Sequence, residues 1–246
     1  MSGDLVSLRL LLVGAPDAAE FWRSAASRVH IPVEFDATTP SSAKVVLSQG
    51  GVDICVLDGA MKAADVASIV KAARRQTRTT LVFASLPPGC ARPDNVDGVF
   101  SAPTNATETD RLVALCIRAK MRTQVLLAAD SESLRSIVRK ILGACRFELD
   151  VHEATDADDT LTRLNGSGFG LIFLDQNLSY LQGADLMRRI RRACPDARIV
   201  VMSSGIMDAA AARPYGPEAM TVLKKPFYPA DVDAVLERYF GFAEPA

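Results

Sequence analysis

The fold is decided by one stretch of the sequence, Leu171-Ile172-Phe173-Leu174-Asp175-Gln176-Asn177. Four consecutive apolar residues are followed by a carboxylate and two amide side chains. A short apolar run of this kind is typical of a strand that is buried on both faces of a parallel sheet. In open α/β sheets, ligands bind outside the carboxyl ends of the strands. The stretch therefore predicts a central strand with Asp175 at the ligand-binding edge.

Similar apolar runs alternate with amphipathic segments through the second half of the chain. The predicted strands cover residues 125–129, 147–152, 171–174, 199–202 and 220–223. The predicted helices cover residues 131–142, 156–164, 183–194, 207–213 and 229–240. This alternation predicts an α/β domain with a parallel sheet that helices cover on both faces.

The same order of elements occurs in the first half of the chain. Its predicted strands cover 8–13, 31–35, 52–57, 80–84 and 98–100, and its predicted helices cover 17–29, 41–47, 62–75 and 107–122. The pattern indicates a duplication of one unit of five strands and five helices. Turn residues at 86–95 nevertheless predict that the fourth helix of the first half is short or lost. We expect two tandem domains, 1–122 and 123–246, with no linker between them.

Composition limits the classes of function. The 246 residues include 28 basic and 29 acidic side chains, so a net charge of −1 argues against nucleic-acid and membrane-surface partners. The five cysteines form no C-x-x-C pair, which favours buried thiols in a reducing compartment. No signal peptide and no apolar run of about 20 residues is present. These features predict a cytoplasmic protein.

Polar side chains follow four of the predicted strands in the second half. They are Asp130, Asp175, Ser203 and Lys225. Right-handed crossovers place the carboxyl ends of parallel strands at one edge of the sheet. We therefore expect two carboxylates, a hydroxyl and an ammonium group to meet there.

These strand ends resemble the receiver domain of two-component response regulators, which folds as a doubly wound, flavodoxin-like, five-stranded unit. Gly183, eight residues after Asp175, also stands where the family usually has a glycine. The resemblance covers the whole second half and rests on four stretches in order: Val125-Leu126-Leu127-Ala128-Ala129-Asp130-Ser131, Leu171-Ile172-Phe173-Leu174-Asp175-Gln176-Asn177, Val201-Met202-Ser203-Ser204 and Leu223-Lys224-Lys225-Pro226-Phe227.

The resemblance implies a role for each edge residue. Asp175 would be the phosphoacceptor and would form an aspartyl phosphate. Asp130, Asp175 and the backbone carbonyl of Asn177 would hold Mg²⁺, which prefers hard oxygen ligands. Lys225 and Ser203 would contact the phosphoryl oxygens.

The resemblance also implies the partners. A histidine kinase or a phosphotransfer protein would donate the phosphoryl group, and output would be by protein–protein contact, because no DNA-binding or enzymatic segment follows residue 240. Homodimerisation is expected, and no small-molecule substrate beyond phosphoryl donors is implied. We therefore do not expect a dedicated enzyme.

Three positions depart from the family pattern. Ala129 replaces the first of two adjacent acidic residues, which predicts weaker Mg²⁺ binding. Ser179 stands at the usual proline after the acceptor, and Val222 stands near the position of an aromatic residue that often gates the switch. The readout is therefore expected to differ from that of chemotaxis-type receivers.

The first half keeps only part of the pattern. Asp58 follows an apolar strand, as Asp175 does, but no carboxylate ends the first strand and Ala102 stands where the second half has Lys225. A phosphoryl group at Asp58 would meet repulsion that nothing offsets. We interpret this half as a degenerate receiver used for packing, dimerisation or partner binding.

Two other functions fit the fold class. In the first, neither half is phosphorylated and the chain is a structural adaptor, with Ala129 marking the loss of chemistry. The second is a flavodoxin-like cofactor binder. It would need a phosphate-binding loop after the first strand, and neither Gly14-Ala15-Pro16 nor Ala129-Asp130-Ser131 supplies one.

Overall fold

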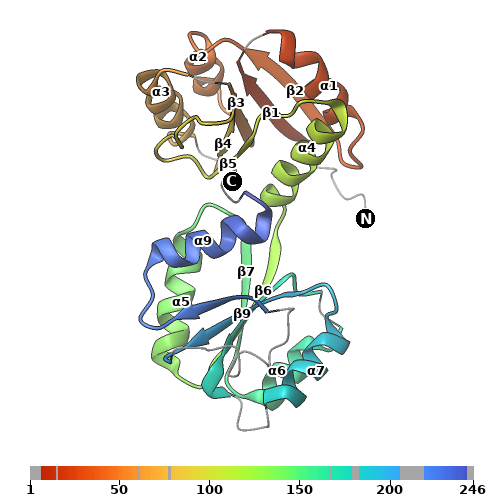
Figure 1. Cartoon of the computed structure of the whole chain (residues 1–246), viewed down its shortest axis with the longest axis vertical. Helices are drawn as coiled ribbons and strands as arrows, with labels where there is room; N and C mark the ends of the chain where they lie inside the picture. Colours follow the sequence, from red (N-terminus) through yellow and green to blue (C-terminus); the bar gives the residue numbers. More distant parts are fainter. Residues whose placement is uncertain are drawn as a thin grey trace. The chain divides into compact units, whose positions relative to one another are not determined.

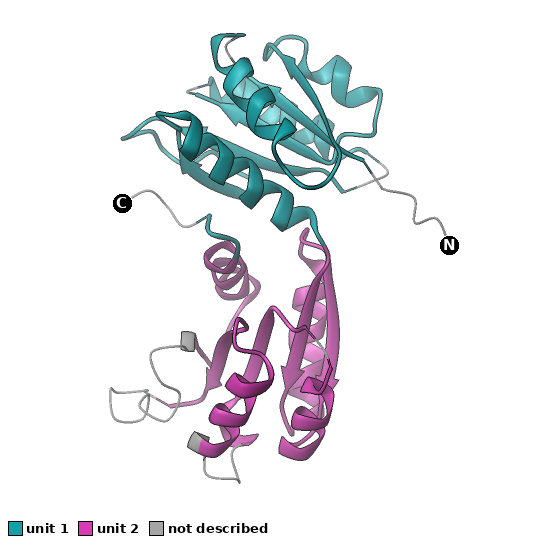
Figure 2. Cartoon of the chain, turned by 90° about the vertical axis from the view of Figure 1, so that its right-hand side faces the viewer, with its two compact units in different colours: residues 1–121, 240–246 teal, residues 122–239 magenta. Residues whose placement is uncertain are grey.

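The computed structural model describes residues 7–14, 16–59, 61–76, 79–166, 168–178, 183–205 and 219–242. The chain forms two compact units, which Figure 2 distinguishes by colour. Unit 1 comprises Met1–Met121 together with Phe240–Ala246, and unit 2 comprises Arg122–Tyr239. Unit 1 therefore contains residues from both ends of the sequence.

Unit 1 contains a five-stranded parallel sheet in the order β2-β1-β3-β4-β5 (Figure 1). Its helices pack in pairs, α1 with α4 and α2 with α3. The strands are β1 (Leu8–Val13), β2 (Val33–Thr38), β3 (Ile54–Asp58), β4 (Leu81–Leu86) and β5 (Gly98–Ser101). The helices are a 3-10 turn η1 (Pro16–Ala18) and α1 (Ala19–Ser27), α2 (Ala43–Ser48), α3 (Ala63–Ala73) and α4 (Ala106–Lys120).

Residues 87–97 join β4 to β5 without a helix, in agreement with the turn signals there. The expected unit of five helices is therefore wrong for this half: its described residues form four α-helices. The cause is local, since Pro87 and Pro88 lack the amide hydrogens that a helix needs and Gly89 has a φ of +79°.

Unit 2 contains a second five-stranded parallel sheet, in the order β10-β9-β8-β6-β7. Its strands are β6 (Thr123–Ala128), β7 (Leu149–Ala154), β8 (Leu171–Asp175), β9 (Arg198–Ser203) and β10 (Ala219–Lys224). Its helices are α5 (Glu132–Ala144), α6 (Ala157–Leu164), a 3-10 turn η2 (Gln176–Leu178), α7 (Gly183–Ala193) and α9 (Pro229–Phe240). The helix predicted at 207–213 lies outside the described residues.

Both sheets have the strand order 2-1-3-4-5 of a flavodoxin-like fold. In unit 2, α6 and α7 cover one face of the sheet, and α5 and α9 cover the other (Figure 1). The predicted fold class, two tandem doubly wound α/β domains, is confirmed.

The central strands form the cores because both of their faces are covered. Every residue of β8 is buried, including Asp175 at its end. Helix α7 shows the complementary pattern: Leu186, Met187 and Ile190 are buried and contribute to one apolar cluster, whereas Arg188 is exposed. Burying each large aliphatic side chain stabilises the fold by about 1.5–3 kcal/mol.

Side-chain caps start three helices close to the strand ends. Ser131 accepts a hydrogen bond from the Leu134 amide at 3.3 Å and caps α5, as the sequence predicts. Asn105 and Asp156 start α4 and α6 in the same way, with bonds of 2.9 and 2.8 Å. These helices therefore begin within a few residues of the preceding strand ends.

The five cysteines are free thiols. Cys55, Cys116 and Cys194 are buried, whereas Cys90 is exposed. Burial raises the pKa of Cys55 to about 12 and also raises the pKa of Cys116. These two thiols are therefore packing groups of the core.

Within the described ranges, no helix combines the length and the apolar character that a membrane span requires.

Candidate functional site

The strand register of unit 2 brings the predicted site residues to one edge. Strand β8 pairs with β9 up to Asp175 and Met202, and β9 pairs with β10 up to Ser203 and Lys224. On the other side of β8, the last pair with β6 is Ala128 and Leu174. Asp130, Asp175, Ser203 and Lys225 therefore all lie within two residues of the last pairs of their strands.

Asp175 and Lys225 are in direct contact at this edge. The Lys225 Nζ lies 2.7 Å from the Asp175 Oδ1, and the two side chains are only 18% and 2% exposed. The backbone amide of Asn177 donates a second hydrogen bond to the same oxygen, at 3.1 Å. A buried carboxylate needs such partners, because burial of an isolated charge is costly.

The hydroxyl of Ser203 is buried and already has partners. It donates a hydrogen bond to the side-chain oxygen of Gln176, and it accepts one from the Gly205 amide at 3.2 Å. Gln176 is a site residue that the sequence reasoning missed as an individual contact. Its position directly after Asp175, at the carboxyl edge of the sheet, could have identified it as a candidate site residue.

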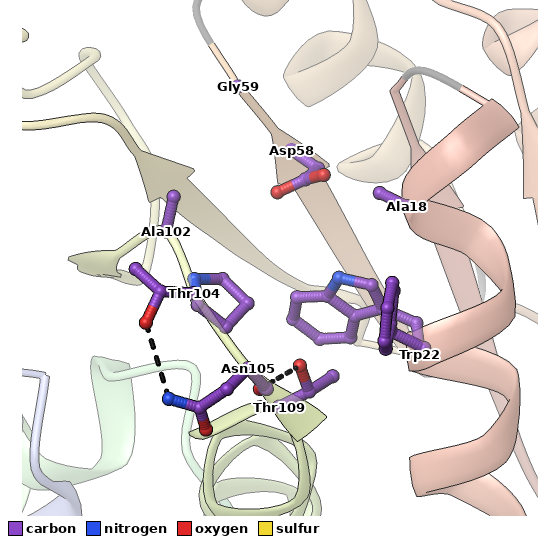
Figure 3. Close-up of a pocket in the computed structure, with 10 residues that line it drawn as sticks. Ala18, Trp22, Asp58, Gly59, Ala102, Thr104, Asn105 and Thr109 are labelled. Carbon is purple, nitrogen blue, oxygen red and sulfur yellow. Dashed lines mark hydrogen bonds between the residues drawn. The ribbon is translucent and has the colours of Figure 1, made fainter. Parts of the chain in front are cut away.

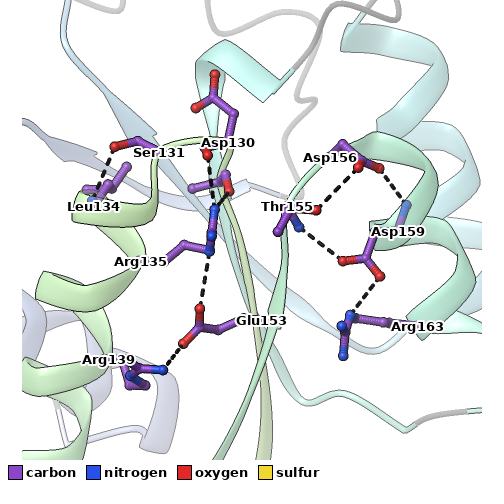
Figure 4. Close-up of polar contacts among 11 residues, drawn as sticks. Asp130, Ser131, Leu134, Arg135, Arg139, Glu153, Thr155, Asp156, Asp159 and Arg163 are labelled. Carbon is purple, nitrogen blue, oxygen red and sulfur yellow. Dashed lines mark hydrogen bonds and ion pairs between the residues drawn. The ribbon is translucent and has the colours of Figure 1, made fainter.

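Asp130 lies at the same edge with an exposed side chain. Figure 4 shows its carboxylate directed away from Arg135, whose Nη1 donates to the backbone carbonyls of Ala129 and Asp130 at 2.7 and 3.0 Å. Glu153 on β7 holds the other side of the guanidinium, at 3.1 Å from Nε. Sequence reasoning did not identify Arg135, which fixes the backbone that carries Asp130.

In the described parts of unit 2, no hydrogen bond or ion pair joins the Asp130 carboxylate to Asp175 or Lys225. The available metal donors at this edge are two carboxylates and the carbonyl of Asn177. Among the described residues, no group of three or more His, Cys, Asp or Glu side chains is placed to hold a metal ion. At this edge Ala129 stands at the position where a further acidic residue was expected. Two carboxylates and a carbonyl still suit Mg²⁺, which usually keeps several of its waters.

Val222 and Ser179 are the two other positions at which the sequence departs from the receiver pattern. Val222 lies on β10 with its side chain 39% exposed. Ser179 lies outside the described residues.

At the equivalent edge of unit 1, no described cation stands at the position that Lys225 occupies in unit 2. The Ala102 amide donates to the Leu86 carbonyl at 2.8 Å, as the Lys225 amide does to that of Ser203 at 2.7 Å. Ala102 therefore occupies the position of Lys225, and Leu86 occupies that of Ser203. Asp58 is partly buried, and its Oδ1 accepts a hydrogen bond from Ser85 Oγ at 2.7 Å.

Comparison with known proteins agrees with this geometry. Residues 125–237 match the family model of the response regulator receiver domain. The structure of a putative two-component system response regulator/GGDEF domain protein is similar along both halves, with 18% identity over 95% of this chain and 98% of that chain and a TM-score of 0.56. A probable response regulator/GGDEF domain protein gives 17% identity, the same coverage of 95% and 98%, and a TM-score of 0.55.

The receiver domain of a sensor histidine kinase from Pseudomonas aeruginosa PAO1, solved with a magnesium ion in its active-site cleft, matches a single domain. It is 19% identical over 49% of this chain and 99% of that chain, with a TM-score of 0.43. Residues 125–237 are therefore similar to the response regulator receiver family. The two longer structural matches show the fold, which is two tandem five-stranded α/β domains arranged as in those proteins.

Proposed function

We propose that the chain is a response regulator that accepts a phosphoryl group from a histidine kinase or a phosphotransfer protein on Asp175. The observation that carries the proposal is the 2.7 Å contact between Lys225 Nζ and the buried Asp175 carboxylate. In this proposal residues 123–246 are the phosphorylatable domain, and residues 1–122 are a degenerate receiver.

The proposed chemistry uses the two oxygens of Asp175 differently. Lys225 and the Asn177 amide hold Oδ1. Oδ2, with no hydrogen bond from the described residues, is the oxygen that would attack phosphorus. A P–O bond forms while the P–N bond of a phosphohistidine breaks, and the released imidazole takes up a proton.

The phosphorylated carboxylate carries more negative charge than the free one. Lys225 would stay next to this charge and stabilise it as a fixed cation. Ser203 would leave Gln176 and donate its hydroxyl hydrogen to a phosphoryl oxygen. Because Ser203 ends β9, this exchange of partners would couple phosphorylation to the loop that follows.

Asp130, Asp175 and the carbonyl of Asn177 would hold Mg²⁺. The bound ion would neutralise charge between the acceptor and the phosphoryl donor. Arg135 would act as a positioning residue, because its guanidinium donates hydrogen bonds to the backbone carbonyls of Ala129 and Asp130. With one fewer carboxylate than the family usually has, we expect a higher Mg²⁺ requirement.

Output would be by protein–protein contact. Val222 on β10 and Tyr228 just before α9 expose apolar surface, at 39% and 67% of their full areas. Such a face could pair two copies of the chain or dock a downstream protein. The chemistry of the chain would be limited to acceptance and loss of the phosphoryl group.

The alternative is a structural adaptor in which neither half is phosphorylated. Fluorine NMR with beryllofluoride and Mg²⁺ separates the two functions, since beryllofluoride imitates a phosphoryl group on a carboxylate. We expect bound-fluoride signals from the wild type and from Asp58→Asn, and none from Asp175→Asn. No bound signal from the wild type at saturating beryllofluoride would favour the adaptor.

A further inference from the structure

A pocket of about 200 Å³ opens at the carboxyl edge of the sheet in unit 1. Figure 3 shows the Asp58 carboxylate between Ala102, which follows β5, and Ala18 and Trp22 at helix α1. Thr104 and Asn105, just before α4, also line it. The pocket therefore lies where unit 2 has its Asp175–Lys225 pair.

Asp58 has no cationic partner among the described residues, whereas Asp175 forms an ion pair with Lys225. Ser85 donates a neutral hydrogen bond to one carboxylate oxygen, at 2.7 Å. No described lysine, arginine or histidine side chain forms an ion pair with Asp58. The structural equivalent of Lys225 is Ala102, which lines the pocket. The missing lysine thus leaves both an uncompensated carboxylate and an empty volume beside it.

The walls favour an organic cation. Trp22 and Phe21 supply aromatic surface, and Pro103 supplies an aliphatic ring. Trp22 is only 1% exposed and Phe21 is 57% exposed, so one ring forms the inner wall and the other the rim. Aromatic rings attract ammonium groups through their quadrupoles and also bury alkyl chains.

An anion does not suit the same pocket. The start of α4 faces it, but the Asn105 side chain accepts a hydrogen bond from the Glu108 amide at 2.9 Å. The Glu108 carboxylate accepts hydrogen bonds from the Thr104 amide and hydroxyl at 2.7 and 2.9 Å. The positive end of the helix is therefore already matched by a carboxylate, and Asp58 would repel a second anion.

We propose that this pocket binds a small primary alkylammonium ion. Its ammonium group would take the place of the lysine Nζ beside Asp58, and its alkyl chain would lie against Trp22 and Pro103. The volume corresponds to roughly six or seven waters at about 30 Å³ each, which is enough for a chain of lysine length. The degenerate domain would thereby be a ligand-binding module that works without phosphorylation.

The test uses the full-length chain and n-butylammonium, which has the four-carbon stem and ammonium group of a lysine side chain. Trp22 is the single tryptophan of the chain, so its fluorescence and its indole N–H resonance both report on this pocket. At constant ionic strength we expect a saturable change of both signals. We expect n-butanol, the neutral analogue, to bind about tenfold more weakly, because it lacks the charge-assisted hydrogen bond.

Two variants test the site, one by removing its negative charge and the other by filling it with an internal ammonium group. Asp58→Asn removes the charge and should weaken n-butylammonium binding about tenfold. Ala102→Lys supplies an internal ammonium and should abolish binding, with circular dichroism checking that the variant is folded. Asp65→Asn, at an exposed position in the first turn of α3, is the matched control and should bind like the wild type.

Three outcomes would overturn the proposal: an unsaturable response, equal binding by wild type and Asp58→Asn, or equal binding of n-butanol and n-butylammonium. Displacement of n-butylammonium by Mg²⁺ at lower concentration would also overturn it, since the pocket would then be a metal site. None of these outcomes depends on whether Asp175 is phosphorylated.

Discussion

At the scale of single residues, the Asp175–Lys225 contact joins side chains 50 positions apart in the sequence. We predict that Lys225→Met destabilises unphosphorylated unit 2 by up to roughly 3 kcal/mol at neutral pH, since a nearly buried carboxylate would lose its cation. Urea unfolding measures this. The double variant Asp175→Asn/Lys225→Met should recover most of the loss, because it leaves no unpaired charge; no recovery would show that Lys225 stabilises the fold by packing alone.

The sequence predicted this pair because two charged residues directly follow strand ends, and parallel strands bring those ends together. It could not predict the contact of Ser203 with Gln176 or that of Arg135 with the carbonyls beside Asp130. These contacts depend on side-chain conformations and on the path of each turn. The counterpart of Ser203 in unit 1 shows the same limit, since only the strand register identifies it as Leu86.

At the scale of elements, the start of α4 depends on Asn105 and Glu108. We predict that Asn105→Ala destabilises unit 1 by about 1 kcal/mol, because the Glu108 amide loses its cap. Chemical unfolding with the far-UV circular dichroism signal measures the change. Asn105→Asp should keep most of the stability, since aspartate is an equally good cap; a similar loss in both variants would contradict the assignment.

The same turn gives α4 a pH dependence. Hydrogen bonds from the Thr104 amide and hydroxyl hold the pKa of Glu108 below its ordinary value. A lowered pKa in the folded state means that the stabilisation is present above the unfolded-state pKa and is lost as the pH falls through the folded-state value. We predict that Glu108→Gln flattens the acid side of the stability curve of unit 1, measured by thermal unfolding at a series of pH values. An unchanged acid side would contradict this.

The central strands were predictable as elements because their apolar runs are continuous, and the resemblance implied the order of the strands in the sheet. Helix ends were less predictable. The helix expected at 17–29 begins as a 3-10 turn and becomes α-helical only over Ala19–Ser27. The spacing of apolar residues does not show at which residue an α-helix begins or ends, or whether its first turn is a 3-10 turn.

At the scale of the whole molecule, unit 1 includes the C-terminal residues Phe240 and Phe242. The ring of Phe242 stacks on Phe83 with centroids 4.5 Å apart. Gly98 makes room for it, because a Cβ there would lie 2.7 Å from Phe242 Cγ. The predicted division into 1–122 and 123–246 placed Phe242 in the second domain, because nothing in the sequence around Phe242 indicates that its ring packs against Phe83.

We therefore predict that Phe242→Ala destabilises unit 1 by roughly 3–5 kcal/mol, although residue 242 follows the whole of unit 2 in the sequence. The fluorescence of Trp22 reports the unfolding of unit 1 alone. Tyr228→Ala, at an exposed position near the same end of the chain, is the control and should have little effect. Equal stability of Phe242→Ala and wild type would contradict the composition of unit 1.

The most direct test of the central claim is phosphorylation of the full chain by acetyl phosphate with Mg²⁺, read by intact mass and by mapping the modified peptide. We predict one acid-stable, base-labile phosphoryl group on Asp175, present in the wild type and in Asp58→Asn and lost in Asp175→Asn. Label that persists in Asp175→Asn, or that appears on Asp58, would contradict the account.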